Sequence, residues 1–443
     1  MGSRETAPQV DCVVVGGGLA GLRAGVEVAR AGWRVHAVEA ADAVGGRART
    51  LWYEGTPVDR GFQTVFTGYP RAREFIRDIG IPDRDLRPFS RGAVYVDGAA
   101  VRRVGFLGGL TPRRGGIGVE DLVTAGRLLA ASRARTPESW LATEGRTTEE
   151  FLRDVGFSGR FIDQIVRPLF GPITLDRSLS TDSGYFRFLL SVIARGQAVI
   201  PSDGVGMIAE WAAAAMRVAG GTIEINVRAE ALEAGSDGRV EGVRLSDGRT
   251  ILGRTVVLAA GAPATGRLLH DIDPAARERL PKRWASSVNA AFALDLPLYR
   301  GRTLLLNASP VLEGPRVDLL CQTSNVTRPG KSGGPHIVLA TLITTGGDEI
   351  GDGEVTTAVS EFVRPAAPRF DWARHAIPIG TYRQRHALPR ATPGDRFTWP
   401  ESRTAAPNLF LAGDALEHPS IEGAVTSGAE AAAEVLRILE SSS

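Results

Sequence analysis

The chain of 443 residues is poor in cysteine and lysine and has no long apolar run. Its two cysteines, Cys12 and Cys321, lie far apart and without CxxC spacing, so we expect neither a disulfide framework nor a thiolate metal site. No window approaches the roughly eighteen apolar residues of a transmembrane helix. The start, Met1 to Gln9, is polar and lacks the apolar core of a signal peptide. These absences predict a cytoplasmic protein, with peripheral membrane attachment left open.

Net charge is also small, because 52 Lys and Arg residues face 50 Asp and Glu residues. No basic run alternates with aromatic residues, so we expect no nucleic-acid partner. His36, His270, His336 and His375 show no spacing typical of metal ligands, and we expect no metal site. With 43% apolar and 23% charged residues, the composition is that of a soluble globular protein.

The first forty residues contain a strand, a glycine-rich turn, a helix and a second strand. Apolar patterning predicts strands over Asp11–Val15 and Arg34–Glu39, with a helix over Leu19–Arg30 between them. Such a unit begins a parallel, doubly wound sheet. The sequence therefore predicts an α/β fold with a Rossmann-type domain.

Strand patterns return in the middle and near the end of the chain. Residues 222–260 contain a hairpin with Ser246-Asp247-Gly248 as its turn, and Leu409–Ala412 reads as a last strand before a helix from about Gly423 to Leu439. A chain of this length favours two domains.

We therefore divide the chain into two discontinuous domains. Residues 1–66, 200–265 and 384–443 form the nucleotide-binding domain, and residues 67–199 and 266–383 form an α+β substrate domain.

The segment from Gly16 to Gly21 contains GxGxxG between the first strand and helix. Gly16 permits a tight turn, Gly18 lets the backbone approach a pyrophosphate, and Gly21 lets the helix pack against the sheet. The helix opens at Leu19 and Ala20, where free N–H groups favour phosphate. Glu39 ends the second strand where a carboxylate binds ribose hydroxyls, which disfavours NADP.

Two further segments favour FAD over NAD. Ala43 to Arg49 contains Gly45-Gly46-Arg47, a glycine pair followed by an arginine able to reach phosphates. Near the C-terminus, Gly413-Asp414 ends a strand, and the helix starting near Gly423 would point its N–H groups at the flavin N1 edge.

Together these motifs resemble the FAD-containing amine oxidase and phytoene desaturase superfamily, which includes protoporphyrinogen oxidase. The resemblance covers both ends and the middle of the chain and implies FAD as cofactor. The resemblance and the motifs described above imply a set of cofactor contacts. They are Gly16, Gly18, Leu19, Ala20, Gly21, Glu39, Ala40, Gly46, Arg47, Gly61, Phe62, Gln63, Val227, Gly413, Asp414, Gly423, Ala424 and Val425.

Three segments are similar to the phytoene-desaturase-like branch. They are Asp59 to Gln63, which looks like the loop beside the isoalloxazine, Arg167 to Gly171 followed by Leu179 to Thr181, and Ser420 to Val425. Neither Lys282 nor Lys331 matches the lysine that amine oxidases of this fold place near the flavin.

The resemblance implies hydride transfer from a mostly apolar, possibly isoprenoid substrate to flavin N5, with reoxidation by oxygen or a quinone. An isomerisation, an amine oxidase, a protoporphyrinogen-oxidase-like enzyme and a non-enzymatic prenyl-binding protein stay open as alternatives. The helical stretch Tyr185–Ala194 is either a tunnel wall or plain core.

Acid and base candidates are few. His386 precedes the last cofactor segment, and Glu417 and His418 follow Asp414, so His386 and Glu417 are our catalytic candidates.

Overall fold

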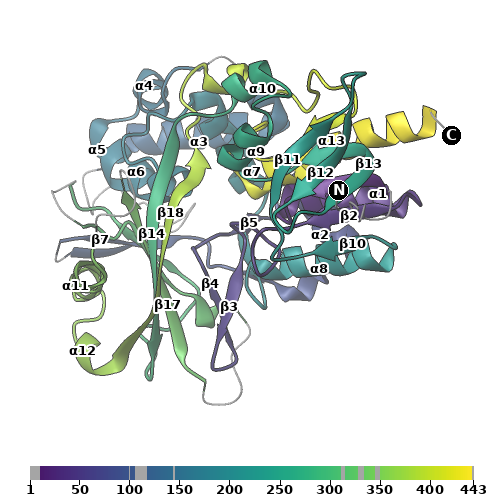
Figure 1. Cartoon of the computed structure of the whole chain (residues 1–443). Coiled ribbons are helices and arrows are strands. Elements are labelled where there is room, and N and C mark those ends of the chain that lie inside the picture. The colour runs from purple at the N-terminus through teal and green to yellow at the C-terminus, as the bar shows by residue number, and fades with distance from the viewer. Residues whose placement is uncertain are drawn as a thin grey trace.

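The computed structural model describes residues 10–98, 100–104, 117–142, 145–310, 315–327, 334–344 and 350–441. Within them, two large sheets lie side by side and helices cover both (Figure 1).

The first sheet is the predicted Rossmann-type sheet. Its parallel strands run in the order β10, β2, β1, β13 and β19, so β1 has one neighbour on each side and its carboxyl end opens between them. An antiparallel hairpin, β11 and β12, extends the edge. The strands are β1 Val10–Val15, β2 Val35–Val38, β10 Thr222–Glu224, β11 Ala229–Ala234, β12 Val240–Leu245, β13 Thr250–Leu258 and β19 Leu409–Leu411.

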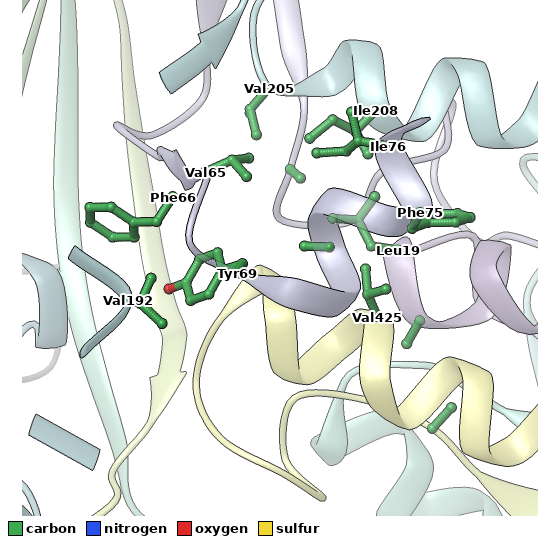
Figure 2. Close-up of a cluster of buried hydrophobic side chains, with 14 of the residues drawn as sticks. Leu19, Val65, Phe66, Tyr69, Phe75, Ile76, Val192, Val205, Ile208 and Val425 are labelled. Carbon is green, nitrogen blue, oxygen red and sulfur yellow. The ribbon is translucent and has the colours of Figure 1, made fainter. Parts of the chain in front are cut away.

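Four helices pack together on one face of this sheet: α1 Leu19–Arg30, α2 Pro70–Asp78, α8 Gly206–Val218 and α13 Ile421–Ser441. Close approach depends on small residues, because a Cβ on Gly428 of α13 would lie 2.3 Å from the Ala20 carbonyl oxygen of α1. Figure 2 shows Leu19, Phe75 and Val425 of three of these helices pointing into one buried cluster.

The second sheet runs in the order β18, β14, β17, β16, β15, β7 and β8. Alternate residues of β14 face opposite sides. Val288, Ala290 and Phe292 pack with Val355 and Val359 of α11, while the residues between them face the middle of the molecule. The elements are β7 Ala93–Asp97, β8 Ala100–Val104, β14 Trp284–Leu294, β15 Leu304–Asn307, β16 Leu319–Gln322, β17 His336–Thr344, β18 Ala376–Pro389, α11 Asp352–Val363 and α12 Trp372–His375.

A group of helices lies next to the second sheet, at the top left of Figure 1. The stretch over Tyr185–Ala194 is helical as predicted, and Asp182 caps it by accepting from the backbone N–H groups of Gly184 and Tyr185 at 2.8 and 3.2 Å. The group contains α3 Val119–Ala134, α4 Thr148–Asp154, α5 Gly159–Phe161, the π-helical turn Ile162–Val166, α6 Arg167–Thr174 and α7 Ser183–Arg195.

The remaining elements are short connections. They are β3 Thr50–Tyr53, β4 Thr56–Asp59, β5 Val65–Phe66, β6 Leu86–Pro88, β9 Ala198–Pro201, α9 Ala262–Leu268, α10 Pro274–Arg279 and the 3₁₀ turns Asp83–Asp85, Glu138–Trp140, Thr323–Asn325 and Asp395–Thr398. Among the described residues, every helix is too short or too polar to cross a bilayer.

Strands from all three segments of the expected nucleotide-binding domain pair in the first sheet. Three elements cross expected boundaries. They are β9 at residues 199 and 200, α9 at residues 265 and 266, and β18, which belongs to the second sheet and continues past residue 383 to Pro389. The domain boundaries themselves stay a prediction.

A buried carboxyl group joins two of the three segments of the expected nucleotide-binding domain. Asp59 at the end of β4 accepts hydrogen bonds from the Thr50 hydroxyl at 2.5 Å and the Val205 N–H at 3.0 Å. Burial raises its pKa from 3.8 to about 7, because these donors only partly replace water.

Asp59 therefore makes stability depend on pH. Its folded pKa lies above its unfolded value, so its contribution is complete below about pH 3.8 and is lost as the pH rises through about 7. Between pH 5 and pH 8 we expect the wild type to lose roughly 1 to 3 kcal/mol of unfolding free energy relative to Asp59→Asn, measured by denaturant titration.

The matched control is Asp352→Asn. A hydrogen bond from Arg383 lowers the pKa of Asp352, so that carboxylate is ionised in both states above pH 5 and its removal should leave the pH profile unchanged. Parallel profiles for wild type and Asp59→Asn would contradict the assignment.

Candidate active site

One cavity of about 2020 Å³ runs between the two sheets. At one end it is lined by the glycine-rich loop after β1, and at the other by the apolar faces of α3, α6 and α7. In the described part of the chain, one continuous cavity thus has one end lined by a nucleotide-binding motif and another end lined by apolar side chains.

The loop after β1 is shaped by its glycines. Gly16 has a φ of +113°, and a Cβ there would lie 2.7 Å from the backbone of Ala259. A Cβ on Gly21 would lie 2.1 Å from the Gly16 carbonyl oxygen, so Gly21 sits behind the loop and does not line the cavity. Gly18 has nothing within 4 Å of its Cβ position and lines the cavity together with Leu19 and Ala20. A phosphate can therefore approach the backbone at the N-terminus of α1.

Glu39 lies at the carboxyl end of β2 and faces the cavity, as does Ala40. Its Oε2 accepts from the Gly17 N–H at 2.7 Å and its Oε1 accepts from the Ala41 N–H at 2.8 Å. Each oxygen retains a lone pair, so the carboxylate is fixed in orientation and still able to accept from two hydroxyl groups.

Val227 lines the cavity next to Glu39. Its backbone N–H is already bonded to the Glu39 carbonyl oxygen at 3.0 Å. The Val227 carbonyl accepts no hydrogen bond from another described residue, which leaves it available to an amino group such as that of adenine.

The glycine-arginine segment and the C-terminal segment meet at the centre of the cavity. Arg47 donates two hydrogen bonds to Asp414, at 2.5 and 2.8 Å, and a third to the Ala387 carbonyl of β18 at 2.8 Å. The guanidinium is enclosed by protein, yet its side chain is 37% exposed because it borders the cavity. Gly46 and Gly413, which adjoin Arg47 and Asp414 in the sequence, also line the cavity. Sequence reasoning predicted each residue separately but missed that they pair.

The loop after β4 forms another wall of the cavity. Gly61, Phe62 and Gln63 line the cavity, and Gln63 Nε2 donates to the Arg47 carbonyl at 2.8 Å. A Cβ on Gly61 would lie 3.3 Å from Asn289 Nδ2 of β14, so this loop lies directly against the second sheet.

The C-terminal helix α13 starts at Ile421, two residues before its predicted start. Ser420 Oγ accepts from the Gly423 N–H at 3.0 Å, so that N–H is already capped. Ile421 and Ala424 line the cavity, whereas Gly423 packs against the His418 backbone and Val425 points into the core (Figure 2). Successive residues of a helix point in directions about 100° apart, so with Ala424 facing the cavity its neighbours 423 and 425 are turned away from it.

Glu422 of the same helix has a role that sequence reasoning missed. Its carboxylate accepts from the N–H groups of Arg71 and Ala72 at 2.9 and 2.7 Å and so caps α2 across 350 residues of chain. Its position after Ile421 carries no local signal for such a contact.

The apolar end of the cavity is formed by the group of helices next to the second sheet. Its walls are aliphatic and aromatic side chains from the second sheet, from helices α3 to α7 and from nearby connections, namely Phe89, Tyr95, Leu128, Leu129, Leu152, Phe157, Phe161, Ile165, Leu169, Phe170, Ile173, Phe186, Leu190, Ile193, Leu304, Leu306 and Leu319. The helix over Tyr185–Ala194 thus contributes both to core and to cavity wall.

The segment from Arg167 to Thr181 holds this wall in place. Arg167 Nη1 donates to the Arg177 carbonyl at 2.7 Å, and Arg177 donates to both oxygens of Asp318, the residue before β16, at 2.7 and 2.6 Å. Asp176 accepts from the Thr181 N–H at 2.8 Å. These bonds fix α6 against the second sheet.

The structure does not bring the two catalytic candidates to the cavity. His386 is exposed on β18, with its ring edge-on to Trp284 at 5.3 Å. Glu417 faces Glu430 of α13, and burial together with the Glu430 carboxylate raises its pKa. His418 is buried beside Phe188, and burial lowers its pKa to about 3, so it stays neutral near pH 7.

Lysine is also absent from the described lining of the cavity. Lys282 lies on the surface, where it is paired with Glu278, and Lys331 lies outside the described residues.

Comparison with known families gives this geometry its context. The family model for flavin-containing amine oxidoreductases matches residues 19–436. The chain belongs to this family. Its cofactor is therefore FAD, and it is a flavin-dependent oxidoreductase, as the sequence motifs predicted.

Two curated relatives support the phytoene-desaturase-like branch. A hydroxysqualene dehydroxylase of Sinorhizobium fredii is 26% identical over 95% of this chain and 96% of its own length. A hydroxyneurosporene desaturase of Rhodobacter capsulatus is 49% identical over a segment covering 13% of this chain and 12% of its own length.

The fold is also that of solved flavoenzymes. A putrescine oxidase bound to putrescine superposes with a TM-score of 0.70 at 17% identity, covering 97% of this chain and 99% of that one. This likeness confirms the predicted α/β, Rossmann-type fold class.

Removal of the Glu39 carboxylate should weaken FAD binding directly. Removing a charge-assisted acceptor for the ribose hydroxyls should raise the dissociation constant for FAD about 10- to 100-fold in Glu39→Ala, measured by titrating the apoprotein with FAD.

Glu224→Ala is the matched control. Glu224 ends the neighbouring strand β10 and pairs with Arg249 outside the cavity lining, so its loss should leave FAD affinity within about twofold. Equal FAD affinities for Glu39→Ala and the wild type would remove Glu39 from the cofactor site.

Proposed function

We propose that this protein oxidises an apolar, isoprenoid-like substrate by passing a hydride from a substrate C–H bond to FAD. The observation that carries the proposal is the single cavity that joins the Gly18 and Glu39 end to an apolar chamber. The two relatives, one named for hydroxysqualene and one for hydroxyneurosporene, support an isoprenoid substrate.

The residues present fit FAD along the length of the cavity. The open backbone at Gly18 and the N-terminus of α1 would hold the pyrophosphate, Glu39 the adenosine ribose and the Val227 carbonyl the adenine. Arg47, Asp414 and the first turn of α13 would hold the ribityl and flavin end. When bound, FAD supplies an acceptor for a hydride.

The protein's part in the reaction is then to bind, orient and keep water out. The aliphatic walls contributed by α6, α7 and the second sheet bury an apolar chain and leave its reacting carbon against the Gly61 loop. Histidine and lysine are absent from the described lining, so a proton released along with the hydride would pass to water or to a lining tyrosine or carboxylate.

His386 and Glu417 are therefore not part of the proposed mechanism. We keep a cytoplasmic location with peripheral membrane contact, and reoxidation by oxygen or a quinone, as parts of the proposal. Anaerobic mixing of the FAD-loaded protein with isoprenoid, porphyrinogen and amine panels should bleach the flavin absorption band only with the isoprenoids. Bleaching by amines alone would overturn the substrate class and leave the flavin chemistry intact.

A variant that fills the chamber should separate substrate binding from cofactor binding. Ile173 of α6 lines the apolar end, so Ile173→Trp should slow anaerobic bleaching by an isoprenoid at least about tenfold because the chain no longer fits. FAD occupancy should be unchanged.

Val218→Trp adds the same ring at a position that is 90% exposed at the end of α8, and its bleaching rate should match that of the wild type. A normal bleaching rate in Ile173→Trp would show that the substrate lies elsewhere.

A further inference from the structure

The second sheet forms one wall of the cavity, and the side chains of this wall change from apolar to polar across the sheet. Across neighbouring strands, Thr341 of β17 pairs with Leu319 of β16, Leu319 pairs with Leu306 of β15, and Leu306 pairs with Tyr95 of β7. These last three side chains line the apolar chamber. The wall becomes polar at Thr341.

On the other side of Thr341 a group of polar side chains lines the cavity, and the apolar residues Ala387 and Leu388 follow further along β18. Asn289 of β14 lies opposite Thr341, and two residues away Ser287 lies opposite Gln384 of β18. All four side chains line the cavity, and Ser287, Asn289 and Thr341 are only 3%, 4% and 6% exposed. We call Ser287, Asn289, Thr341 and Gln384 the polar wall.

Hydrogen bonding within the polar wall leaves donors unused. Thr341 Oγ1 donates to Asn289 Oδ1 at 2.9 Å, and Asn289 Nδ2 donates to Ser287 Oγ at 3.1 Å. Among the described residues, no acceptor takes the Ser287 hydroxyl proton or the second N–H of Asn289, and the Gln384 amide has no partner. Buried donors without acceptors cost free energy, so such a surface favours a ligand that carries an oxygen atom.

The position of the polar wall links it to the reacting end of the cavity. Asn289 lies directly behind Gly61, where a Cβ would come within 3.3 Å of its amide nitrogen. Gly61 belongs to the loop that resembles the one beside the isoalloxazine, and the proposed function puts the reacting carbon of the substrate against this loop. A group held by the polar wall is therefore close to the flavin, while an attached apolar chain lies along Leu319 and Leu306.

We infer that the polar wall binds an oxygen function of the substrate, either a hydroxyl or a carbonyl group, and selects an oxygenated isoprenoid over the corresponding hydrocarbon. This inference rests on the proposed function. Ser287 and Asn289 are the specificity-determining residues, because their free O–H and N–H groups point to an acceptor that a hydrocarbon lacks.

The test compares two probes that differ by one hydroxyl group. FAD-loaded full-length protein is titrated with all-trans-farnesol and with the hydrocarbon that lacks only its hydroxyl group, and binding is followed by the perturbation of the flavin spectrum. The wild type should bind the alcohol about tenfold more tightly. Ser287→Ala and Asn289→Leu should each lose most of that preference while binding the hydrocarbon as the wild type does.

Ser286→Ala is the matched control, because Ser286 lies next to Ser287 on β14, outside the cavity lining, and its hydroxyl donates to the Thr344 carbonyl at 2.7 Å. It should keep the alcohol preference. Ser287→Ala removes a single oxygen atom and so tests the inference even if Asn289→Leu does not fold.

Three results would overturn the inference. The wild type could bind the alcohol and the hydrocarbon with equal affinity, the variants could lose affinity for both probes equally, or the FAD-loaded protein could bind neither probe. A protein that retains no FAD would contradict the proposed function itself, whereas an FAD-loaded protein without alcohol preference contradicts the polar wall alone.

Discussion

The ion pair between Arg47 and Asp414 is the contact on which the organisation of the site depends. It joins residues 367 positions apart with two hydrogen bonds, and a third bond ties Arg47 to β18 of the second sheet. Breaking such an enclosed pair costs free energy, because the remaining charge would lack a partner in a poorly solvated part of the protein. The glycine-arginine loop, the end of β19 and the second sheet are therefore held in one arrangement around the cavity.

What could be predicted from the sequence follows from how local each feature is. The loop from Gly16 to Gly21 and its helix are set by adjacent residues, and their strand, turn and helix were predicted almost to the residue. Glu39 was predictable because a fixed spacing separates it from that loop. The fold class and the cofactor followed from these local signals together with the C-terminal Gly413-Asp414 segment.

The substrate end could not be predicted in the same way, because its walls come from segments that meet only through tertiary contacts. Ser287 and Thr341 lie on the mostly buried strands β14 and β17, and the two side chains come to line one surface only when these strands pair. The same reason applies to Val425. The packing of α13 against α1 and α2 sets which of its side chains face the cavity, and no local signal in the sequence specifies that packing.

Two kinds of wall therefore share one cavity, and each constrains the chemistry differently. The apolar helices gain free energy from any chain of sufficient size, so they give affinity with little discrimination. The polar wall discriminates more sharply, because a ligand without an oxygen atom leaves buried donors unpaired. Since the polar wall lies against the Gly61 loop and the apolar walls extend away from it, the orientation of a bound chain follows from the order of the strands β18, β14, β17, β16 and β15. The strand order of the second sheet thus decides which end of a substrate reaches the flavin.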